Sequence, residues 1–380
     1  MDRKKNLLYI HTVEEGRPFQ GVRKKIQMQC QAFEDLGLDV KILESGKRTF
    51  FGQIEKIFPL SYGVNYKIIR NQLLKYETNS IDYCYIRYSP ASRGLLDVLK
   101  LLKHTQECVK IIIEIPTYPY ESEFKSIKAK PSKIRDHIYR RKMKKYVDLI
   151  VTPSNLDEMD VFGIPACEIT NGINLNLIAP RACKNDSANV INLIGCALIT
   201  PRQGYERVIK GIDCYNKIKK ETDPEVRFFI IGSGEYQTEL KKLCESLDLS
   251  KYVMFEGQKE GSALDYYYDI GSLGIGSLGT YKTNELKKVN SLKTREYCAK
   301  GLPFLITKCD HIFAKANPFF CHVVEEEENE ISIQDVVSFV KKMYKYYSQE
   351  QVVTLMRDFA SENLSWTTIL KNVLEKVCEK

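Results

Sequence analysis

The chain has 380 residues, a length that suggests two domains, because single domains mostly contain roughly 100–200 residues. Hydrophobic residues make up 43% and charged residues 28%, which excludes a disordered chain, a collagen and a small disulfide scaffold. The formal net charge is +8, and the apolar runs are far shorter than the roughly 20 residues that span a bilayer. The N-terminal apolar stretch is also short and meets Glu14 and Glu15, which is not typical of a signal peptide.

Strand-like and helix-like segments alternate along the first half of the chain. The pattern predicts strands at 7–12, 39–43, 83–87, 109–115 and 148–152, and helices at 21–36, 91–103 and 132–146. Strands that are apolar almost throughout, separated by amphipathic helices, indicate a parallel sheet covered on both faces.

The positive charge is concentrated in residues 125–145, which contain ten Lys or Arg and one acidic residue, a net charge of +9. An amphipathic helix is predicted here, with its apolar stripe formed by Ile134, Ile138, Met143, Tyr146 and Val147. A basic amphipathic helix is attracted to anionic lipid by about 1 kcal/mol per basic residue. We therefore predict contact with an anionic membrane surface, and a merely solvated face is the alternative. The contacting cations are Lys133, Arg140, Arg141, Lys144 and Lys145. No nucleic-acid-binding motif accompanies the charge.

A second alternating series follows the loop at 171–188. It predicts strands at 190–194, 226–231, 252–255, 270–277 and 304–307, and helices at 206–219, 236–246, 262–268, 292–300, 332–347, 349–361 and 366–378. We therefore predict two doubly wound α/β domains that join near residue 172.

Metal and redox motifs are missing from the sequence. The twelve cysteines include no CxxC, which is typical of buried thiols in a reducing cytoplasm, and the five histidines form no HExxH or HxxxH pair. The sequence lacks Asp-x-Asp and the phosphate loop GxxxxGK[ST], so no metal and no cofactor are predicted. The GxGxxG of Gly274, Gly276 and Gly279 is not followed directly by a helix, so we interpret these glycines as thinning a buried strand or admitting a ligand to its backbone.

Three turns are suited to anion binding at a helix N-terminus. Gly21 opens the first helix, Gly232-Ser233-Gly234 follows a strand directly, and Ser291 precedes a helix that has Lys293 in its first turn. Without a metal motif, cationic side chains and helix dipoles have to neutralise any bound diphosphate.

Four blocks of the second half resemble, in order and spacing, the nucleotide-sugar-binding domain of GT-B glycosyltransferases. They are VINLIGCALITPRQGYERVIKGI, FFIIGSGE, YVMFEGQ and SLKTREYCAKGLPFL. The closest resemblance is to family 4, of the polysaccharide-biosynthesis type, and it extends over nearly the whole chain. It implies two Rossmann-like domains that face a cleft. Residues 1–172 would bind the acceptor, residues 173–361 the nucleotide sugar, and residues 362–380 would cross back onto the first domain.

The resemblance also implies roles for single residues on the donor side. Glu296 matches the glutamate that binds the donor ribose, which fits a carboxylate accepting from two adjacent hydroxyls. Ser291 and Lys293 would face the diphosphate. Gly195 matches the glycine of the strand-end turn. The remaining donor-side residues are Gly234, near the sugar, and Gln258, near the base.

Two departures from the family pattern accompany this match. Cys196 and Gln203 stand where the family has an arginine and a lysine, so Arg202 or Arg207 is expected to supply the missing charge. The family also has a glutamate eight positions before Glu296, where this chain has Lys288, and Glu285 is out of register.

The predicted activity is transfer of a hexosyl-type sugar from a nucleotide-diphosphate sugar to a hydroxyl of a membrane-associated, lipid-linked saccharide. Metal independence is expected, and retention of configuration is implied by the resemblance alone. Lys293, Arg202 and Glu114 are the predicted catalytic residues, with Gly21, Tyr118 and Tyr120 on the acceptor side. The expected location is cytoplasmic, on the inner face of the cell membrane. The alternatives are a non-catalytic GT-B partner subunit of another transferase and a sugar-nucleotide 2-epimerase.

Overall fold

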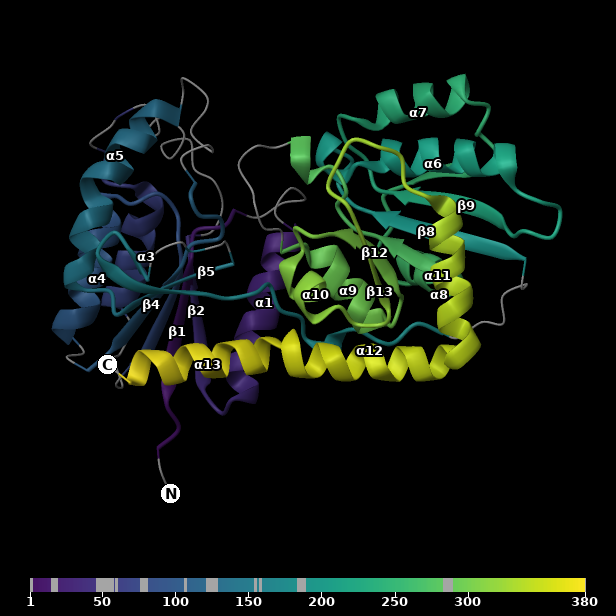
Figure 1. Cartoon of the computed structure of the whole chain (residues 1–380). Helices are drawn as coiled ribbons and strands as arrows, with labels where there is room; N and C mark the ends of the chain where they lie inside the picture. The colour runs from purple at the N-terminus through teal and green to yellow at the C-terminus, as the bar shows by residue number, and fades with distance from the viewer. Residues whose placement is uncertain are drawn as a thin grey trace. The chain divides into compact units, whose positions relative to one another are not determined.

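The computed structural model describes residues 3–14, 20–45, 58, 61–75, 81–105, 108–120, 129–153, 156, 159–182, 189–282 and 290–379. The chain forms two compact units (Figure 1). Unit 1 contains Met1–Thr170 and Trp366–Lys380, and unit 2 contains Asn171–Ser365. Residues 171–172 and 362–365, which the sequence analysis assigns to the first domain, fall in unit 2.

Unit 1 is built on a seven-stranded sheet with the strand order β2-β1-β3-β4-β5-β7-β6, in which the short β6 alone runs antiparallel to its neighbour. Its strands are β1 (Asn6–His11), β2 (Asp39–Glu44), β3 (Tyr83–Arg87), β4 (Lys110–Glu114), β5 (Leu149–Thr152), β6 (Asp160–Val161) and β7 (Ile164–Glu168). Its helices are α1 (Gln20–Asp35), α3 (Val64–Leu74), α4 (Arg93–Thr105), α5 (Lys130–Arg140), the 3-10 helix η5 (Arg141–Lys145) and α13 (Trp366–Cys378).

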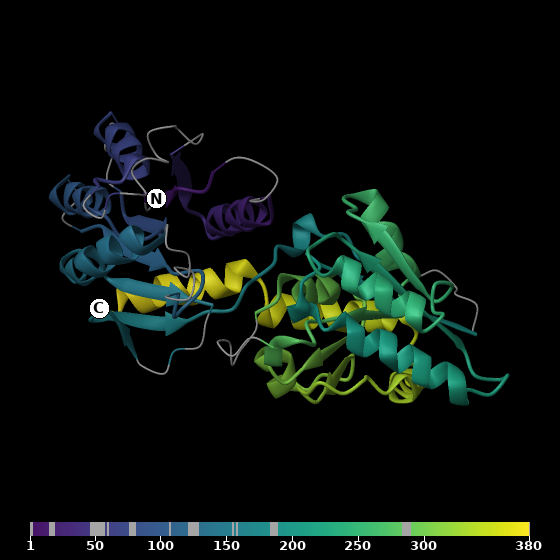
Figure 2. The same cartoon turned by 90° about the horizontal axis from the view of Figure 1, so that it is seen from above.

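Alternating strand residues divide the interior of unit 1 into two layers. Leu8, Ile86 and Ile113 face one layer, which α3, α4 and the η5 residue Met143 cover. Tyr9, Tyr85 and Ile112 face the other layer, which α1 and α13 cover. Figures 1 and 2 show α13, in yellow, packed beside α1.

Unit 2 has a six-stranded parallel sheet with the order β10-β9-β8-β11-β12-β13, the arrangement of a Rossmann fold. Its strands are β8 (Val190–Cys196), β9 (Glu225–Ile231), β10 (Val253–Gly257), β11 (Leu273–Ile275), β12 (Phe304–Thr307) and β13 (Cys321–Val324). Its helices are η6 (Leu175–Leu177), η7 (Pro201–Gln203), α6 (Tyr205–Ile218), α7 (Gln237–Ser246), α8 (Ser262–Ile270), η8 (Thr280–Lys282), α9 (Leu292–Lys300), α10 (His311–Ala316), α11 (Ile333–Tyr346) and α12 (Gln349–Asn363).

Apolar residues of α6, α7 and α11 fill one side of this sheet, and residues of α8, α9, α10 and α12 fill the other. Strand order reverses between β8 and β11, so the helices that follow these two strands, α6 and α9, cover opposite faces of the sheet. In open α/β sheets such a switch point is where ligands bind, at the carboxyl ends of the strands.

The basic helix of unit 1 is oriented differently from the prediction. Ile134 is 52% and Ile138 37% exposed, whereas Arg135 and Asp136 are buried. The reason is a polar network, because the Asp136 carboxylate accepts hydrogen bonds from two tyrosine hydroxyls and the Ala91 backbone N–H. The predicted apolar stripe is therefore wrong in its first two members, and the helix changes to a 3-10 helix after Arg140.

Candidate functional site

The loops that leave β8 and β11 meet at the switch point of unit 2. Leu278 N–H donates to the Gln203 carbonyl over 3.0 Å, and Gly279 N–H donates to the Arg202 carbonyl over 3.1 Å. This approach requires a glycine at 279, since a Cβ there would lie 2.4 Å from the Pro201 carbonyl oxygen. The contact fixes the loop that carries Arg202 and Gln203 above the carboxyl ends of the two strands.

Lys293, in the first turn of α9, reaches this loop. Its ammonium donates to Gln203 Oε1 over 2.7 Å and lies 5.1 Å from the centre of the Tyr205 ring. Burial lowers the pKa of Lys293 to about 7; Cys196 opposes this shift, and the positive charge of Arg202 adds to it. An amine with this pKa is about half protonated at pH 7, and an anion that binds beside it favours the charged form.

The N-terminus of α9 adds to this positive potential. Ser291 is its N-cap residue, and the Ser291 side chain accepts no capping hydrogen bond. The helix is held in place by the buried pair of Arg295 and Asp310, whose atoms Nη1 and Oδ2 are 2.6 Å apart. Two predicted donor-binding residues, Ser291 and Lys293, thus share a fixed helix N-terminus suited to anions.

Gly195, which precedes the last residue of β8, has a packing role. It is buried in β8, and a Cβ on it would lie 2.8 Å from the Tyr205 ring. Because Gly195 has no side chain, the Tyr205 ring can occupy this position, where it lies over the end of β8 and contacts the Lys293 ammonium. Tyr205 and the orienting role of Gln203 were not predicted from the sequence, although both residues stand in the block PRQGYER.

Cys196 and Glu296 lie near a buried tyrosine at the same place. The Tyr297 hydroxyl accepts from the Cys196 N–H over 3.1 Å and donates to the Ile194 carbonyl over 3.2 Å, which ties α9 to the end of β8. Burial raises the pKa of Tyr297, with contributions from Cys196 and Glu296. Glu296 is half-buried on α9 one turn after Lys293, and its predicted contact with the donor ribose stays a prediction.

The turn Gly232-Ser233-Gly234 is packed against the loop after β8. A Cβ on Gly232 would lie 1.9 Å from the Ala197 carbonyl oxygen, and one on Gly234 would lie 2.1 Å from that of Ile199. These glycines therefore allow two backbones to touch. Gln258 is exposed directly after β10. The predicted contacts of Gly234 with the sugar and of Gln258 with the base stay predictions.

Arg207 has a structural set of partners. It is 2% exposed, and its guanidinium donates to the backbone carbonyls of Asn329, Leu278 and Glu325 over 2.7, 2.9 and 3.1 Å. Arg202, by contrast, is half-exposed on η7. Of the two arginines predicted to replace the missing charge, Arg202 is therefore the better placed.

Glu114, at the end of β4 in unit 1, is the centre of a buried ionic cluster. Lys25 and Arg87 donate to Oε1 over 2.7 and 3.2 Å, and Gln29 and Tyr85 donate to Oε2 over 2.7 and 2.8 Å. Burial alone would raise the pKa of Glu114, but the charges of Lys25 and Arg87 and the hydrogen bonds lower it to about 2. With 0% exposure and four donors, Glu114 is better suited to ordering unit 1 than to direct chemistry.

Two of the other predicted acceptor-side residues, Tyr118 and Tyr120, lie together in unit 1, with their ring centres 6.5 Å apart. Gly21 is exposed near the start of α1. Tyr120 is buried and donates to Asp136 Oδ2 over 2.7 Å, whereas Tyr118 is half-buried with its ring 6.2 Å from that of Phe162. His11, at the end of β1, is also buried, and burial lowers its pKa to about 4.

The predicted membrane cations lie on α5 and η5. Lys133, Arg141, Lys144 and Lys145 are exposed, and Arg140 is half-buried. Within the described ranges, no helix has the length and apolarity needed to cross a membrane. The same residues contain no group of three or more His, Cys, Asp or Glu side chains that could hold a metal ion. Lys288 and Glu285 lie outside the described residues.

Comparisons with known proteins agree with this fold. Residues 193–335 match the family of glycosyl transferases group 1, and no curated protein sequence matches the chain. A glycosyltransferase from Rickettsia africae ESF-5 is similar in structure, with 13% identity, a TM-score of 0.65 and coverage of 100% of this chain and 99% of that one. Sucrose-phosphate synthase of Thermosynechococcus elongatus has 13% identity, a TM-score of 0.65 and coverage of 99% of both chains. Anabaena HepE in complex with UDP-glucose has 13% identity, a TM-score of 0.59 and coverage of 99% of this chain and 100% of that one.

Two parallel-sheet units with these structural neighbours define a GT-B fold. Within this fold, the segment that matches the glycosyl transferases group 1 family, residues 193–335, lies in unit 2. The fold and the resemblance predicted from the sequence are thus confirmed, while membership of family 4 stays a prediction.

Proposed function

We propose that this chain transfers a sugar, of hexosyl type, from a nucleoside-diphosphate sugar to a hydroxyl group of a membrane-associated, lipid-linked saccharide. The observation that carries the proposal is the pair of cations at the switch point of unit 2, where Arg202 helps to lower the pKa of Lys293 to about 7. Two neighbouring cations repel each other, and an anion with two or more charges between them removes that cost. HepE, which shares the fold, is named in complex with UDP-glucose, which supports a donor of this kind.

In the proposed reaction the bond between the anomeric carbon and the β-phosphate oxygen breaks, and the acceptor oxygen bonds to that carbon. The proton of the acceptor hydroxyl is released, and the nucleoside diphosphate leaves with the bonding electron pair. Lys293, Arg202 and the N-terminus of α9 stabilise the charge that develops on the diphosphate, without a metal ion. Glu296 binds the ribose, Gln258 and Gly234 lie along the base and sugar, and the sugar keeps its anomeric configuration.

Unit 1 is proposed to bind the acceptor, with Gly21, Tyr118 and Tyr120 as contacts. Its exposed basic residues on α5 and η5 hold the protein on the anionic cytoplasmic face of the membrane. The exposed Ile134 and Ile138 lie on the same helix and support this proposal, because an interfacial helix needs apolar side chains that can enter the lipid.

The direct test is to measure release of nucleoside diphosphate from a panel of nucleotide sugars, with and without vesicles that carry a lipid-linked saccharide. We expect release with one donor, acceleration by the acceptor vesicles, an unchanged rate with EDTA, and loss of most activity in Lys293→Met. Lys217→Met is the matched control, since Lys217 is exposed on α6 and pairs with Asp213. A chain that binds no donor would instead be the non-catalytic partner of another transferase.

A further inference from the structure

A cavity of about 410 Å³ lies in unit 1, outside the donor site. Three cations, Arg140, Arg141 and Lys144, line it together with the aromatic side chains of Tyr118 and Phe162. Its size is in the lower part of the roughly 300–1,000 Å³ typical of small-molecule pockets. The basic surface predicted from the sequence therefore contains a cavity that is lined by both positive and aromatic side chains.

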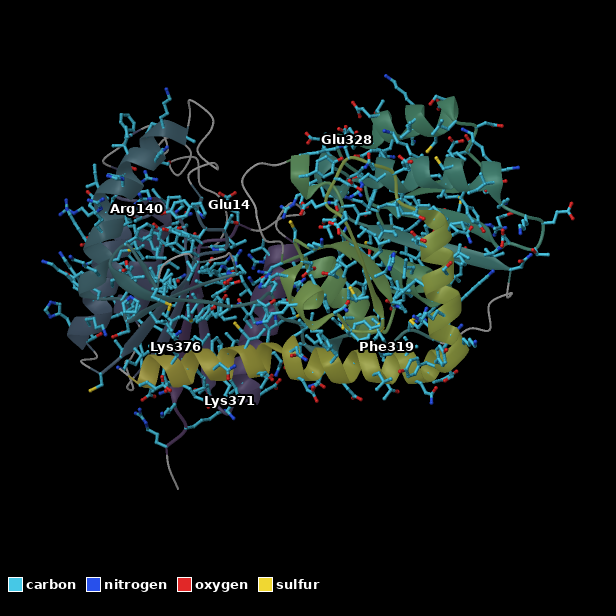
Figure 3. The ribbon with its side chains drawn as sticks, viewed as in Figure 1. Glu14, Arg140, Phe319, Glu328, Lys371 and Lys376 are labelled. Carbon is cyan, nitrogen blue, oxygen red and sulfur yellow. The ribbon has the colours of Figure 1, made fainter. Side chains whose placement is uncertain are left out.

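Arg140, labelled in Figure 3, forms a fixed wall of this cavity. Its Nη1 lies 3.5 Å from Asp136 Oδ2, and its guanidinium stacks 4.7 Å from the centre of the Phe162 ring. Asp136 is itself held by the hydroxyls of Tyr88 and Tyr120. A guanidinium held this way loses little side-chain entropy when it binds a ligand.

The turn between β6 and β7 also lines the cavity, through Phe162 and Gly163. Phe162 has a φ of 60° and Gly163 a φ of 74°. Positive φ values at both central residues are the usual geometry of a two-residue hairpin turn, here the turn that joins the antiparallel strands β6 and β7. Asp160, the acidic residue that lines the cavity, is hydrogen-bonded within this turn, because its Oδ1 accepts from the Gly163 N–H over 3.2 Å.

Arg141 and Lys144 are exposed, and neither has an ion-pair partner among the residues that the structure describes. The lining of the cavity therefore contains three cations and one carboxylate, that of Asp160, so it has a net positive charge. Guanidinium and ammonium groups donate several hydrogen bonds each, a pattern that fits the oxygens of a phosphate group.

We propose that this cavity binds a terminal phosphate group, carried either by a membrane lipid or by a soluble molecule. The lipid source rests on the proposed membrane contact, whereas phosphate binding itself does not. The basic surface then recognises a headgroup by its shape and does not respond to negative surface charge alone. Lys133 and Lys145, which are exposed on the same segment but do not line the cavity, supply only long-range attraction.

The test compares two double variants of the full chain, Arg141→Gln/Lys144→Gln in the cavity and Lys133→Gln/Lys145→Gln outside it. Each is bound to phosphatidylcholine vesicles that contain either phosphatidic acid, which has a terminal phosphate, or phosphatidylglycerol, which has none, at equal surface charge. We expect the natural chain to bind phosphatidic acid vesicles at least about fivefold more tightly. The cavity variant should lose this preference, and the control variant should keep it while binding both vesicles more weakly. The proposal would be overturned by three results together: the natural chain binds both kinds of vesicle equally, both variants bind vesicles equally weakly, and the cavity variant binds pyrophosphate as the natural chain does.

Binding of inorganic pyrophosphate, measured by calorimetry in a Lys293→Met background, separates the two sources. Pyrophosphate binding that the cavity variant loses, without any vesicle preference, supports a soluble phosphate and rejects the lipid. Vesicle preference that pyrophosphate abolishes supports the lipid. The thermal shift with nucleotide sugars should be unchanged in the cavity variant with Lys293 present, so failure of this inference can be told from failure of the proposed donor site.

Discussion

The titration of Lys293 gives the most specific test of the donor site. Its pKa of about 7 means that roughly nine tenths of the molecules carry the ammonium at pH 6, one tenth at pH 8 and one hundredth at pH 9. The diphosphate of a nucleotide sugar attracts the charged form, and binding raises the pKa of Lys293. Donor affinity should therefore be full below pH 7 and fall about tenfold per pH unit above it.

Calorimetry with a nucleotide sugar at pH 6, 7, 8 and 9 measures this dependence. We expect the affinity to fall up to about 100-fold across the range, and close to one proton to be taken up per donor bound at pH 8. Lys293→Met should bind weakly at every pH, and its affinity sets the limit that the natural chain approaches in alkali. Lys293→Arg keeps its charge and should lose the pH dependence. An affinity that is constant from pH 6 to 9, or an equal slope in Lys293→Met, would refute this assignment.

Four further substitutions separate structural roles from binding roles. Arg207→Ala should lower the free energy of unfolding, measured in urea, by about 3 kcal/mol, because three backbone carbonyls lose a charged donor. Arg202→Ala should weaken donor binding, measured by calorimetry, about tenfold at nearly unchanged stability. If Arg202→Ala instead lowered stability and Arg207→Ala weakened donor binding, the two roles would be exchanged. Glu114→Gln should cost about 3–5 kcal/mol at pH 7. The pKa of Glu114 is about 2 in the folded state and 4.5 for an ordinary glutamate, so its stabilisation is present above pH 4.5 and is lost as the pH falls toward 2. If urea unfolding showed that Glu114→Gln costs as much stability at pH 2 as at pH 7, the ionic cluster would be contradicted. Gly21→Ala should stabilise α1 by up to about 1 kcal/mol, because a Cβ there meets no atom within 4 Å; unchanged turnover in this variant would remove Gly21 from the acceptor site.

The sequence predicts most of the long elements because their hydrophobic periodicity is strong. The helix predicted at 292–300 coincides with α9, and the strand predicted at 304–307 coincides with β12. The missed elements include β6, with two residues, and α10, with six, which are too short to show a period. The strand predicted at 270–277 shrinks to Leu273–Ile275 because α8 continues to Ile270.

The candidate site could be predicted in its residues but not in its contacts. Lys293 and Gln203 are 90 positions apart in the chain, and only the meeting of the β8 and β11 loops brings them within hydrogen-bond distance. Likewise, the position of Arg207 in the first turn of α6 could be read from the pattern, but the direction of its side chain could not. The orientation of α5 was mispredicted because the buried carboxylate of Asp136 outweighs two isoleucines, and a hydrophobic pattern carries no information on such a network.

The central claim is that unit 2 binds a nucleotide sugar through Glu296 and Lys293. The measurement that tests it most directly is the thermal shift of the purified chain with a panel of nucleotide sugars, compared between the natural chain, Glu296→Ala and the control Glu239→Ala on α7. We predict that one donor raises the melting temperature of the natural chain and of the control, and that Glu296→Ala loses this shift. No shift with any donor, or an equal shift in all three proteins, would contradict the claim.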